Sequence, residues 1–491
     1  MTGLVAVPMA VPLAAMALTI LAGRSRSAQR VISLATLAAM ALVTVALLVH
    51  VDGSGPLAAV AGGWPAPIGI SLVVDRFAAI MLVIAQVMLL AVLVYAIGQG
   101  GVEERHVGFH PVYLALAAGV SGAFVAGDLF NLFVCFEVML TASFVLLTLG
   151  GRSDQVRTGM TYVVISLLAS VLFLAAVSFF YAATGTVNMA DLSVKLATLD
   201  PGLRQALILL LLVVFGVKAA VFPLFFWLPD SYPTAPTAVT AVLAGLLTKV
   251  GVYAIVRTQT LLADPAERPA ALLAAVAGAT MLVGVLGAIA QNDMKRILSF
   301  QVVSQIGYVV MGLGFFTAAG LAGAILYIVH SIIVKTTLFL TSGLVEHRSG
   351  TGHLDQVSGL VRSAPVLGVL FLLPALSLAG VPPLSGFVAK LALVDAGMAR
   401  ASYAVVGISL LVSLLALFSM TRIWAGAFWG EVAPVGRPQR ALPALMLVPT
   451  AALTAASVAV ALAAGPLFGL STRAAEELLS RRAYVEAVLD R

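Results

Sequence analysis

Apolar residues occur along most of this chain in long runs that short polar connectors separate. A helix that crosses the hydrocarbon core of a bilayer needs about 20 residues. Runs of this length predict an all-α polytopic membrane protein with about 14 transmembrane helices. The predicted runs cover residues 3–22, 31–50, 75–98, 109–127, 129–150, 158–182, 205–229, 235–256, 269–290, 297–317, 319–343, 364–394, 402–425 and 443–469.

The composition agrees with this class and excludes several others. The chain of 491 residues is 61% hydrophobic and 10% charged, with a mean hydropathy of +1.10, whereas soluble domains carry about 25% charged residues. Its basic residues are scattered in short connectors, which argues against nucleic-acid binding. The single cysteine, Cys135, excludes an internal disulfide and is interpreted as core packing. There is no cysteine cluster for an iron–sulfur centre and no nucleotide-binding loop, so we expect no cofactor, no metal and no enzymatic chemistry in the chain itself.

The ends of the chain and the connectors predict its topology. The first run is followed by arginines without a small-residue cleavage pattern, so we expect a retained span rather than a signal peptide. Connectors after odd-numbered runs hold twelve basic residues and those after even-numbered runs hold six, which predicts cytoplasmic odd connectors and both termini outside. Four arginines in the tail count against this orientation. The twelve are Arg24, Arg26, Arg30, Arg105, Arg152, Arg157, Lys295, Arg296, Arg348, Arg362, Arg437 and Arg440, and the six are Arg76, Lys195, Arg204, Arg257, Arg268 and Arg400. The tail 471–491 has apolar residues at helical spacing and is predicted to lie as a surface helix on the membrane or on a partner.

Lysine is selectively placed inside the apolar runs. Of 27 basic residues only six are lysines, yet Lys218, Lys249, Lys335 and Lys390 all fall within predicted spans. A buried lysine can release its proton, whereas arginine stays charged in proteins. This choice favours groups that exchange protons inside the membrane. The alternatives are lysines that snorkel to an interface, or structural charges that neighbours satisfy.

Two further titratable groups lie at membrane depth. Glu137 follows Asp128, a predicted helix start, by nine residues, or about 13 Å along a helix, and is expected to pair with Lys218. The alternative is a protonated glutamate that bonds to backbone. His330 adds a third titratable type, and the alternative for it is a simple hydrogen bond between helices.

Two predicted spans contain helix breaks. Pro223 follows Lys218 in ALILLLLVVFGVKAAVFPLFFWLP, residues 206–229, and Pro382-Pro383 precede Lys390 in LAGVPPLSGFVAK. Broken helices near the midplane occur at corresponding positions of internal repeats in transporters. The reversed order of lysine and proline suggests two repeats of inverted topology. We therefore divide the chain into 1–108 (three helices), 109–256 and 257–428 (two five-helix repeats, each with one break) and 429–491 (the last helix and an amphipathic tail).

Long segments resemble one membrane-protein family. The stretch VKAAVFPLFFWLPDSYPTAPTAVTAVLAGLLTKVGVYAIVR resembles the antiporter-like subunits shared by respiratory complex I, membrane-bound hydrogenases and Mrp-type cation/proton antiporters. So do QNDMKRILSFQVVSQIGYVVMGLG, HSIIVKTTLFLTSGL and GVPPLSGFVAK. Phe225 and Phe226 before the WLPD motif, and Tyr232 after it, are similar to the D-type subunit of Mrp antiporters. At the position where proton-pumping relatives often have a histidine, four residues before Lys335, this chain has Ser331.

The resemblance implies a function and partners. It implies 14 helices and a proton route through Glu137, Lys218, Lys249, Lys335 and Lys390. The implied function is a proton-translocating subunit of a multisubunit Na⁺/H⁺ antiporter in the bacterial plasma membrane, with other membrane subunits, among them a larger homologous A-type subunit, as partners. An alternative is a proton-pumping membrane-arm subunit of a complex I-like NADH:quinone oxidoreductase or a membrane-bound hydrogenase. A stand-alone transporter of a small organic solute is a third possibility.

Overall fold

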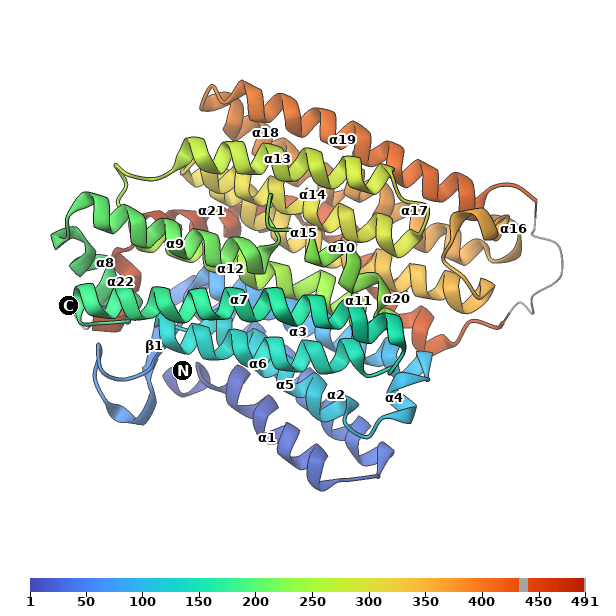
Figure 1. Cartoon of the computed structure of the whole chain (residues 1–491), viewed down its shortest axis with the longest axis horizontal. Coiled ribbons are helices and arrows are strands. Elements are labelled where there is room, and N and C mark those ends of the chain that lie inside the picture. The colour runs from blue at the N-terminus through green and yellow to red at the C-terminus, as the bar shows by residue number, and fades with distance from the viewer. Residues whose placement is uncertain (432–439, 490–491) are drawn as a thin grey trace.

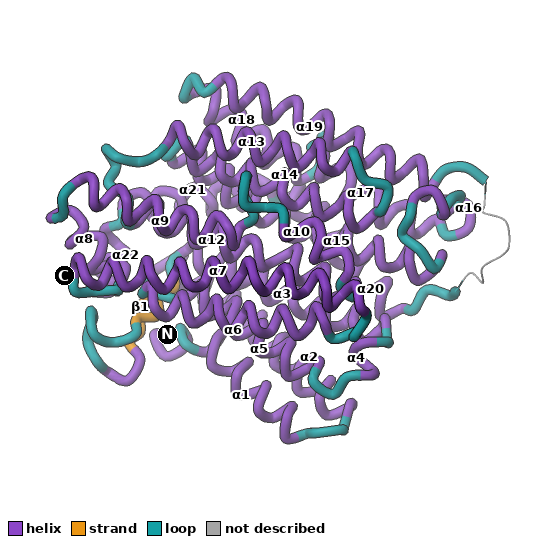
Figure 2. Tube along the Cα trace, viewed as in Figure 1, coloured by secondary structure: helices purple, strands orange, loops and turns teal. Residues whose placement is uncertain are grey.

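The computed structural model describes residues 1–431 and 440–489 as a bundle of helices that run roughly side by side (Figures 1 and 2). Every predicted apolar run contains a helix. Among the described residues, eleven helices are long and apolar enough to cross a membrane, and three shorter apolar helices occupy further runs. The all-helical membrane class is confirmed, whereas the total of fourteen spans stays a prediction. Arg437, used above for the orientation, lies outside the described residues.

The N-terminal part consists of helices and one hairpin. Its elements are α1 (Val7–Leu21), α2 (Arg26–Ser54), β1 (Leu57–Val60), β2 (Ser71–Val74), α3 (Arg76–Gln99) and α4 (Val102–Arg105). The strands are antiparallel, with Leu57 opposite Val74. The buried Glu103 of α4 ties three helices together, because it pairs with Arg30 of α2 at 2.7 Å and with His110, at the start of the next helix, at 2.9 Å.

Two following blocks share one order of elements. The first holds α5 (Phe109–Val125), α6 (Leu129–Thr148), α7 (Ser153–Thr184), α8 (Met189–Lys195), α9 (Pro201–Ala219), α10 (Trp227–Ser231), α11 (Thr237–Val242) and α12 (Thr248–Leu261), with a π-helical turn at Leu243–Leu247. The second holds α13 (Ala270–Ile289), α14 (Met294–Gly314), α15 (Ala318–Ser349), α16 (Leu360–Ser363), α17 (Pro365–Ala379), α18 (Ser385–Ala399) and α19 (Tyr403–Ile423), followed by a π-helical turn at Trp424–Phe428.

Matching local features recur at opposite ends of the bundle. Asp128 caps α6 and forms a bridge with Asn188 after α7, while Asp293 caps α14 and forms a bridge with His353 after α15. The first bridge lies at the end of the bundle that carries β1, and the second lies near α16 at the other end (Figure 1). In each block the span after these helices is interrupted, between α9 and α10 and between α17 and α18. This arrangement supports two repeats of inverted orientation.

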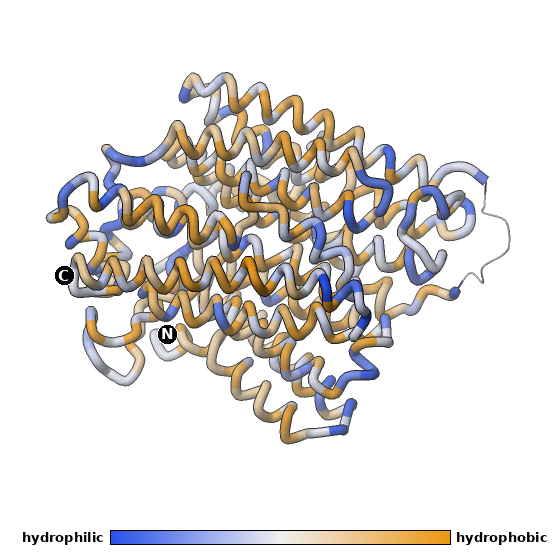
Figure 3. Tube along the Cα trace, in the orientation of Figure 1, coloured by the Kyte–Doolittle hydropathy of each residue, from blue (hydrophilic) through white to orange (hydrophobic). Residues whose placement is uncertain are grey.

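The three most buried spans have comparatively low hydropathies. The α11–α12 span is buried along its whole apolar window, and α14 and α15 are buried over 94% of theirs, with hydropathies of 1.9, 1.5 and 1.7. By contrast α7, with a hydropathy of 2.7, is 39% buried, and it lies on the outside of the bundle (Figure 3). Spans that face other helices can hold polar side chains, whereas spans that face lipid must stay apolar.

The C-terminal tail corrects one prediction. It forms α21 (Ala464–Ser480) and α22 (Arg482–Leu489) after α20 (Ala444–Leu462). Its apolar side does not lie free for a membrane or a partner, because α21 packs against α15 and α3 and fully buries Ala474 and Ala475. The tail is therefore part of the bundle. Helical spacing showed that one face must be covered, but it did not show by what.

Candidate functional site

Glu137, Ser170 and Lys218 form the first polar group inside the bundle. Lys218, in the last turn of α9, donates from Nζ to Ser170 Oγ at 3.1 Å and to the Ser166 carbonyl at 3.2 Å. The Ser170 hydroxyl in turn donates to Glu137 Oε1. No direct ion pair joins Glu137 and Lys218 among the described residues. The expected pair is therefore a three-membered bridge, and Ser170 was missed because a serine in an apolar helix has no distinctive sequence signal.

The break after α9 fixes the position of Lys218. The helix ends at Ala219, and Pro223 lies in the non-helical linker that precedes α10. Backbone groups freed by the break find side-chain partners: Phe222 N donates to Thr280 Oγ1 at 3.0 Å, and Trp227 Nε1 donates to the Val217 carbonyl at 3.1 Å. Irregular backbone at membrane depth is stable only where other protein groups or water satisfy it in this way.

Lys249 lies on the neighbouring span and is held by another helix irregularity. Its ammonium donates to the Ala244 carbonyl at 2.8 Å, within the π-helical turn. A Cβ on Gly251 would lie 2.6 Å from Ala219 N, so the glycine lets α12 approach the last turn of α9. A cavity of about 20 Å³ is lined by Lys218 and by Leu247, which lies two residues before Lys249 in the sequence. Such a volume holds about one water molecule.

Lys335 lies deepest of the predicted residues. Its side chain is 0% exposed, and Nζ has no hydrogen-bond partner in the described part of the chain. It lies within electrostatic range of both Lys249 and Lys390. The structure thus brings together three buried amines from α12, α15 and α18.

Lys390 and His330 surround the second break. Lys390 Nζ donates to the carbonyls of Leu378 and Ala379, at 3.0 and 2.9 Å, at the C-terminal end of α17, where the helix dipole favours a positive charge. His330 Nδ1 lies 2.9 Å from Ser385 Oγ at the start of α18.

The loop between α17 and α18 holds Pro382 and Pro383. Ser331, at the position where a histidine was expected, donates to the Ile328 carbonyl of its own helix at 3.2 Å.

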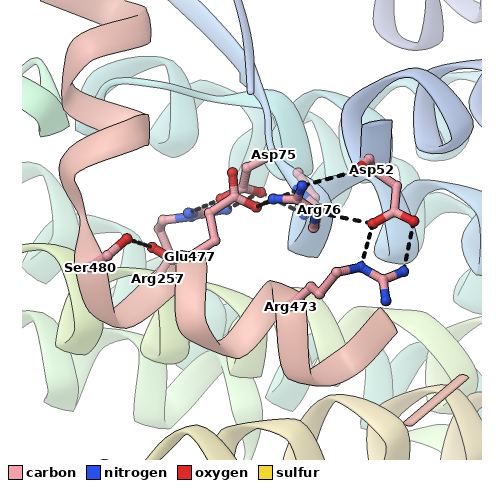
Figure 4. A network of polar contacts seen from close by, with 8 residues as sticks. Asp52, Asp75, Arg76, Arg257, Arg473, Glu477 and Ser480 are labelled. Atoms are coloured by element: carbon pink, nitrogen blue, oxygen red, sulfur yellow. Dashed lines mark hydrogen bonds and ion pairs between the residues drawn. The ribbon is translucent and has the colours of Figure 1, made fainter. Parts of the chain in front are cut away.

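A second polar group, at the end of the bundle that carries the termini, was not predicted. Arg257 was predicted to lie in a connector, but it lies in α12 and is 4% exposed. Its guanidinium forms a bidentate ion pair with the Asp75 carboxylate, with N–O distances of 2.5 and 2.7 Å. Glu477 of α21 lies close by (Figure 4). These residues are far apart in the sequence, so no local pattern could pair them. No cluster of three or more His, Cys, Asp or Glu residues able to hold a metal occurs within the described ranges.

Comparisons with known proteins agree with this arrangement. A family model described as "NADH:quinone oxidoreductase/Mrp antiporter, TM" matches residues 126–416. The D subunit of the Na(+)/H(+) antiporter of Alkalihalophilus pseudofirmus is 44% identical over 492 residues, and that of Bacillus subtilis is 38% identical over 499, each over 100% of both chains.

Chains of solved structures also superpose on this chain. A chain of the Mrp complex from Dietzia sp. DQ12-45-1b superposes with a TM-score of 0.94 at 33% identity, over 99% of both chains. A chain of respiratory complex I from Thermus thermophilus superposes with a TM-score of 0.82 at 25% identity, over 97% of this chain and 99% of that one. This protein therefore belongs to the NADH:quinone oxidoreductase/Mrp antiporter transmembrane family, and within it to the antiporter D subunits.

Proposed function

We propose that this chain is the proton-translocating D subunit of a multisubunit Na⁺/H⁺ antiporter in the bacterial plasma membrane. The observation that carries the proposal is a set of titratable groups inside the bundle: the half-buried Glu137 and Lys218 at one break, the buried Lys249 and Lys335, and the buried Lys390 with His330 at the other break. The names of the relatives supply the ions and indicate a complex of several subunits, and the family resemblance implies a larger A-type subunit among the partners.

The proposed mechanism is proton transfer between these groups. Several buried polar atoms of the bundle have no hydrogen-bond partner among the described residues, namely Tyr232 OH, Thr248 Oγ1, Ser299 Oγ, Gln305 Nε2, His330 Nε2, Lys335 Nζ and Thr336 Oγ1. Because buried polar groups in proteins bond to protein or to water, we expect water to connect the lysines. Three adjacent ammonium groups would repel one another, so a charge on one lysine favours release of a proton from the next.

The energy scale fits transport across a membrane. Making or breaking a hydrogen bond to a charged group changes the free energy by about 1.5–3 kcal/mol, and moving one charge through 100 mV changes it by about 2.3 kcal/mol. Rearrangement of the Glu137–Ser170–Lys218 bridge therefore has the size needed to drive, or respond to, the movement of one proton.

Antiport by the reconstituted complex tests the proposal. Glu137→Ala and Lys218→Ala should each abolish Na⁺-driven proton movement into liposomes, measured with a pH-sensitive dye, while the complex still assembles. Lys195→Ala is the matched control, because Lys195 is an exposed lysine paired with Asp191 on the short helix α8. Full antiport by either of the first two variants would refute the mechanism.

The orientation and the alternative function have their own tests. We infer that the end carrying α4 and α16 faces the cytoplasm and that both termini lie outside. A membrane-impermeant maleimide should then label Thr2→Cys from the outside of intact cells.

The alternative, a membrane-arm subunit of an oxidoreductase, draws on the likeness to complex I and to an archaeal sulfane sulfur reductase, whose chain superposes with a TM-score of 0.89 at 26% identity over 99% of both chains. Flavin or iron–sulfur proteins that co-purify with the intact complex would favour it over the antiporter.

A further inference from the structure

Helix α21 is anchored by charged groups at the end of the bundle where both termini lie (Figures 1 and 4). Arg473 donates to both carboxylate oxygens of Asp52, at 2.9 and 2.7 Å. Arg76, in the first turn of α3, donates from Nε to Asp52 Oδ1 at 3.1 Å. Asp52 thus has two arginine partners and lies partly in solvent. These pairs tie α21 to α2 and α3.

The Asp75–Arg257 pair is more deeply buried than the Asp52 pairs, and both of its carboxylate oxygens have hydrogen-bond partners. Both nitrogens of the Arg257 fork bond to the carboxylate, and Asp75 Oδ1 also accepts from Ala78 N as the cap of α3. The guanidinium packs over the rings of Tyr253 and Tyr484, at 5.4 and 5.1 Å from their centroids. Asp75 is therefore occupied as the partner of Arg257 and the cap of α3.

Glu477 is the incompletely satisfied carboxylate of this network. It is 7% exposed, and its Oε2 accepts from Arg76 N at 3.3 Å and Arg76 Nη1 at 3.1 Å. Its Oε1 is buried and has no partner among the described residues. Burial, followed by the nearby Asp75 carboxylate, raises the pKa of Glu477, although Arg76 opposes the rise. The other charged or titratable groups of the network are Asp52, Arg257 and Tyr484.

A polar face of α12 connects this network with the central lysines. Lys249, Tyr253 and Arg257 follow one another at intervals of four residues, which places them on one side of the helix. Tyr253 OH accepts from Arg257 Nη2 at 3.1 Å and donates to the Phe124 carbonyl at 2.7 Å. The buried hydroxyl of Tyr484 has no partner in the described chain, and it lies beside the same guanidinium.

We propose that Glu477 is a proton-exchange group of the translocation route, placed between the surface at the termini end and Lys249 in the bundle centre. The inference rests on the proposed function. The arginines here cannot release protons, so they hold the carboxylates in place and leave Glu477 as the group that can be protonated and deprotonated. Tyr253 and Tyr484 supply hydroxyls along the path inward.

Variants of α21 separate this role from simple anchoring. In the reconstituted complex, Glu477→Gln should lose most of the antiport while assembly is retained, and Glu477→Asp should keep activity with a shifted pH profile. Arg473→Gln removes the Asp52 pair but leaves Glu477 and should behave like the wild type. The inference is overturned if Glu477→Gln matches the wild type in rate and pH profile, or if Arg473→Gln loses as much antiport as Glu477→Gln.

A second measurement needs no variant. Dicyclohexylcarbodiimide modifies buried carboxyl groups in their protonated form, and peptide mass spectrometry locates the adduct. Treatment of the wild-type complex should modify Glu477, less so as the pH rises, and a Glu477 that stays unmodified at every pH contradicts the inference. If the wild-type complex itself moves no protons in exchange for Na⁺, the proposed function fails. If it does so and the Glu477 measurements are negative, only this inference fails.

Discussion

Replacing Ser170 by alanine tests whether Glu137 and Lys218 communicate through the hydroxyl between them. Ser170→Ala removes one oxygen, which accepts from Lys218 Nζ at 3.1 Å and donates to Glu137. The side chain lies on α7, 5% exposed, so the change leaves the outer surface of the bundle almost unaltered.

The expected loss of antiport rate in Ser170→Ala follows from the contact that Lys218 keeps. A hydrogen bond to a charged group contributes about 1.5–3 kcal/mol, which corresponds to roughly ten- to a hundredfold in an equilibrium or a rate, because about 1.4 kcal/mol is tenfold. Lys218 keeps its bond to the Ser166 carbonyl at 3.2 Å, and a water molecule can take part of the vacated space. We therefore expect the lower end, a loss of about tenfold in antiport rate.

The assay is Na⁺-dependent proton movement in liposomes that contain the assembled complex. Ser178→Ala is the matched control, because this serine of the same helix donates only to the Leu174 carbonyl at 2.9 Å and is exposed. Wild-type antiport by Ser170→Ala would refute the bridge.

Three further predictions concern stability and packing. Asp75→Asn leaves Arg257 buried without its counter-charge, which should destabilise the fold by about 3–5 kcal/mol and lower the thermal-unfolding midpoint far more than Asp154→Asn at the exposed pair on α7. Burial raises the pKa of Glu103, but hydrogen bonds from Arg30 and His110 outweigh this effect and lower the pKa from 4.5 to about 2. The ionised Glu103 therefore stabilises the folded state above pH 4.5, and this stabilisation is lost as the pH falls toward 2. The difference in unfolding midpoint between wild type and Glu103→Gln should shrink over that range, and a constant difference would contradict the assignment. Gly251→Ala places a methyl carbon 2.6 Å from backbone of the last turn of α9, so it should separate the two helices and reduce antiport, whereas wild-type activity and stability would show that the contact tolerates a side chain.

The candidate site was predictable in part, because its lysines are conspicuous. A charge in an apolar run is costly enough to stand out, and this cost singles out Lys218, Lys249, Lys335 and Lys390 from the sequence alone. Prolines inside such runs similarly indicated the two breaks. Ser170 could not be found in this way, since serine is common in membrane helices and costs little there.

The sequence by itself determined that the chain is a helical membrane protein with ionisable groups at membrane depth. Hydropathy is a property of each segment alone, because every apolar run of sufficient length reaches the same lipid environment. It also showed that the tail has one apolar face.

Only the tertiary structure decided which groups meet. It placed a serine between Glu137 and Lys218, brought two buried lysines from separate helices within electrostatic range of a third, and folded the tail back so that Glu477 lies near Asp75. The physical reason is that helix neighbours within a bundle depend on close packing between surfaces distant in sequence, such as the contact at Gly251. Apolar surfaces of similar composition attract one another without specifying a partner, so shape and the few polar contacts choose among them.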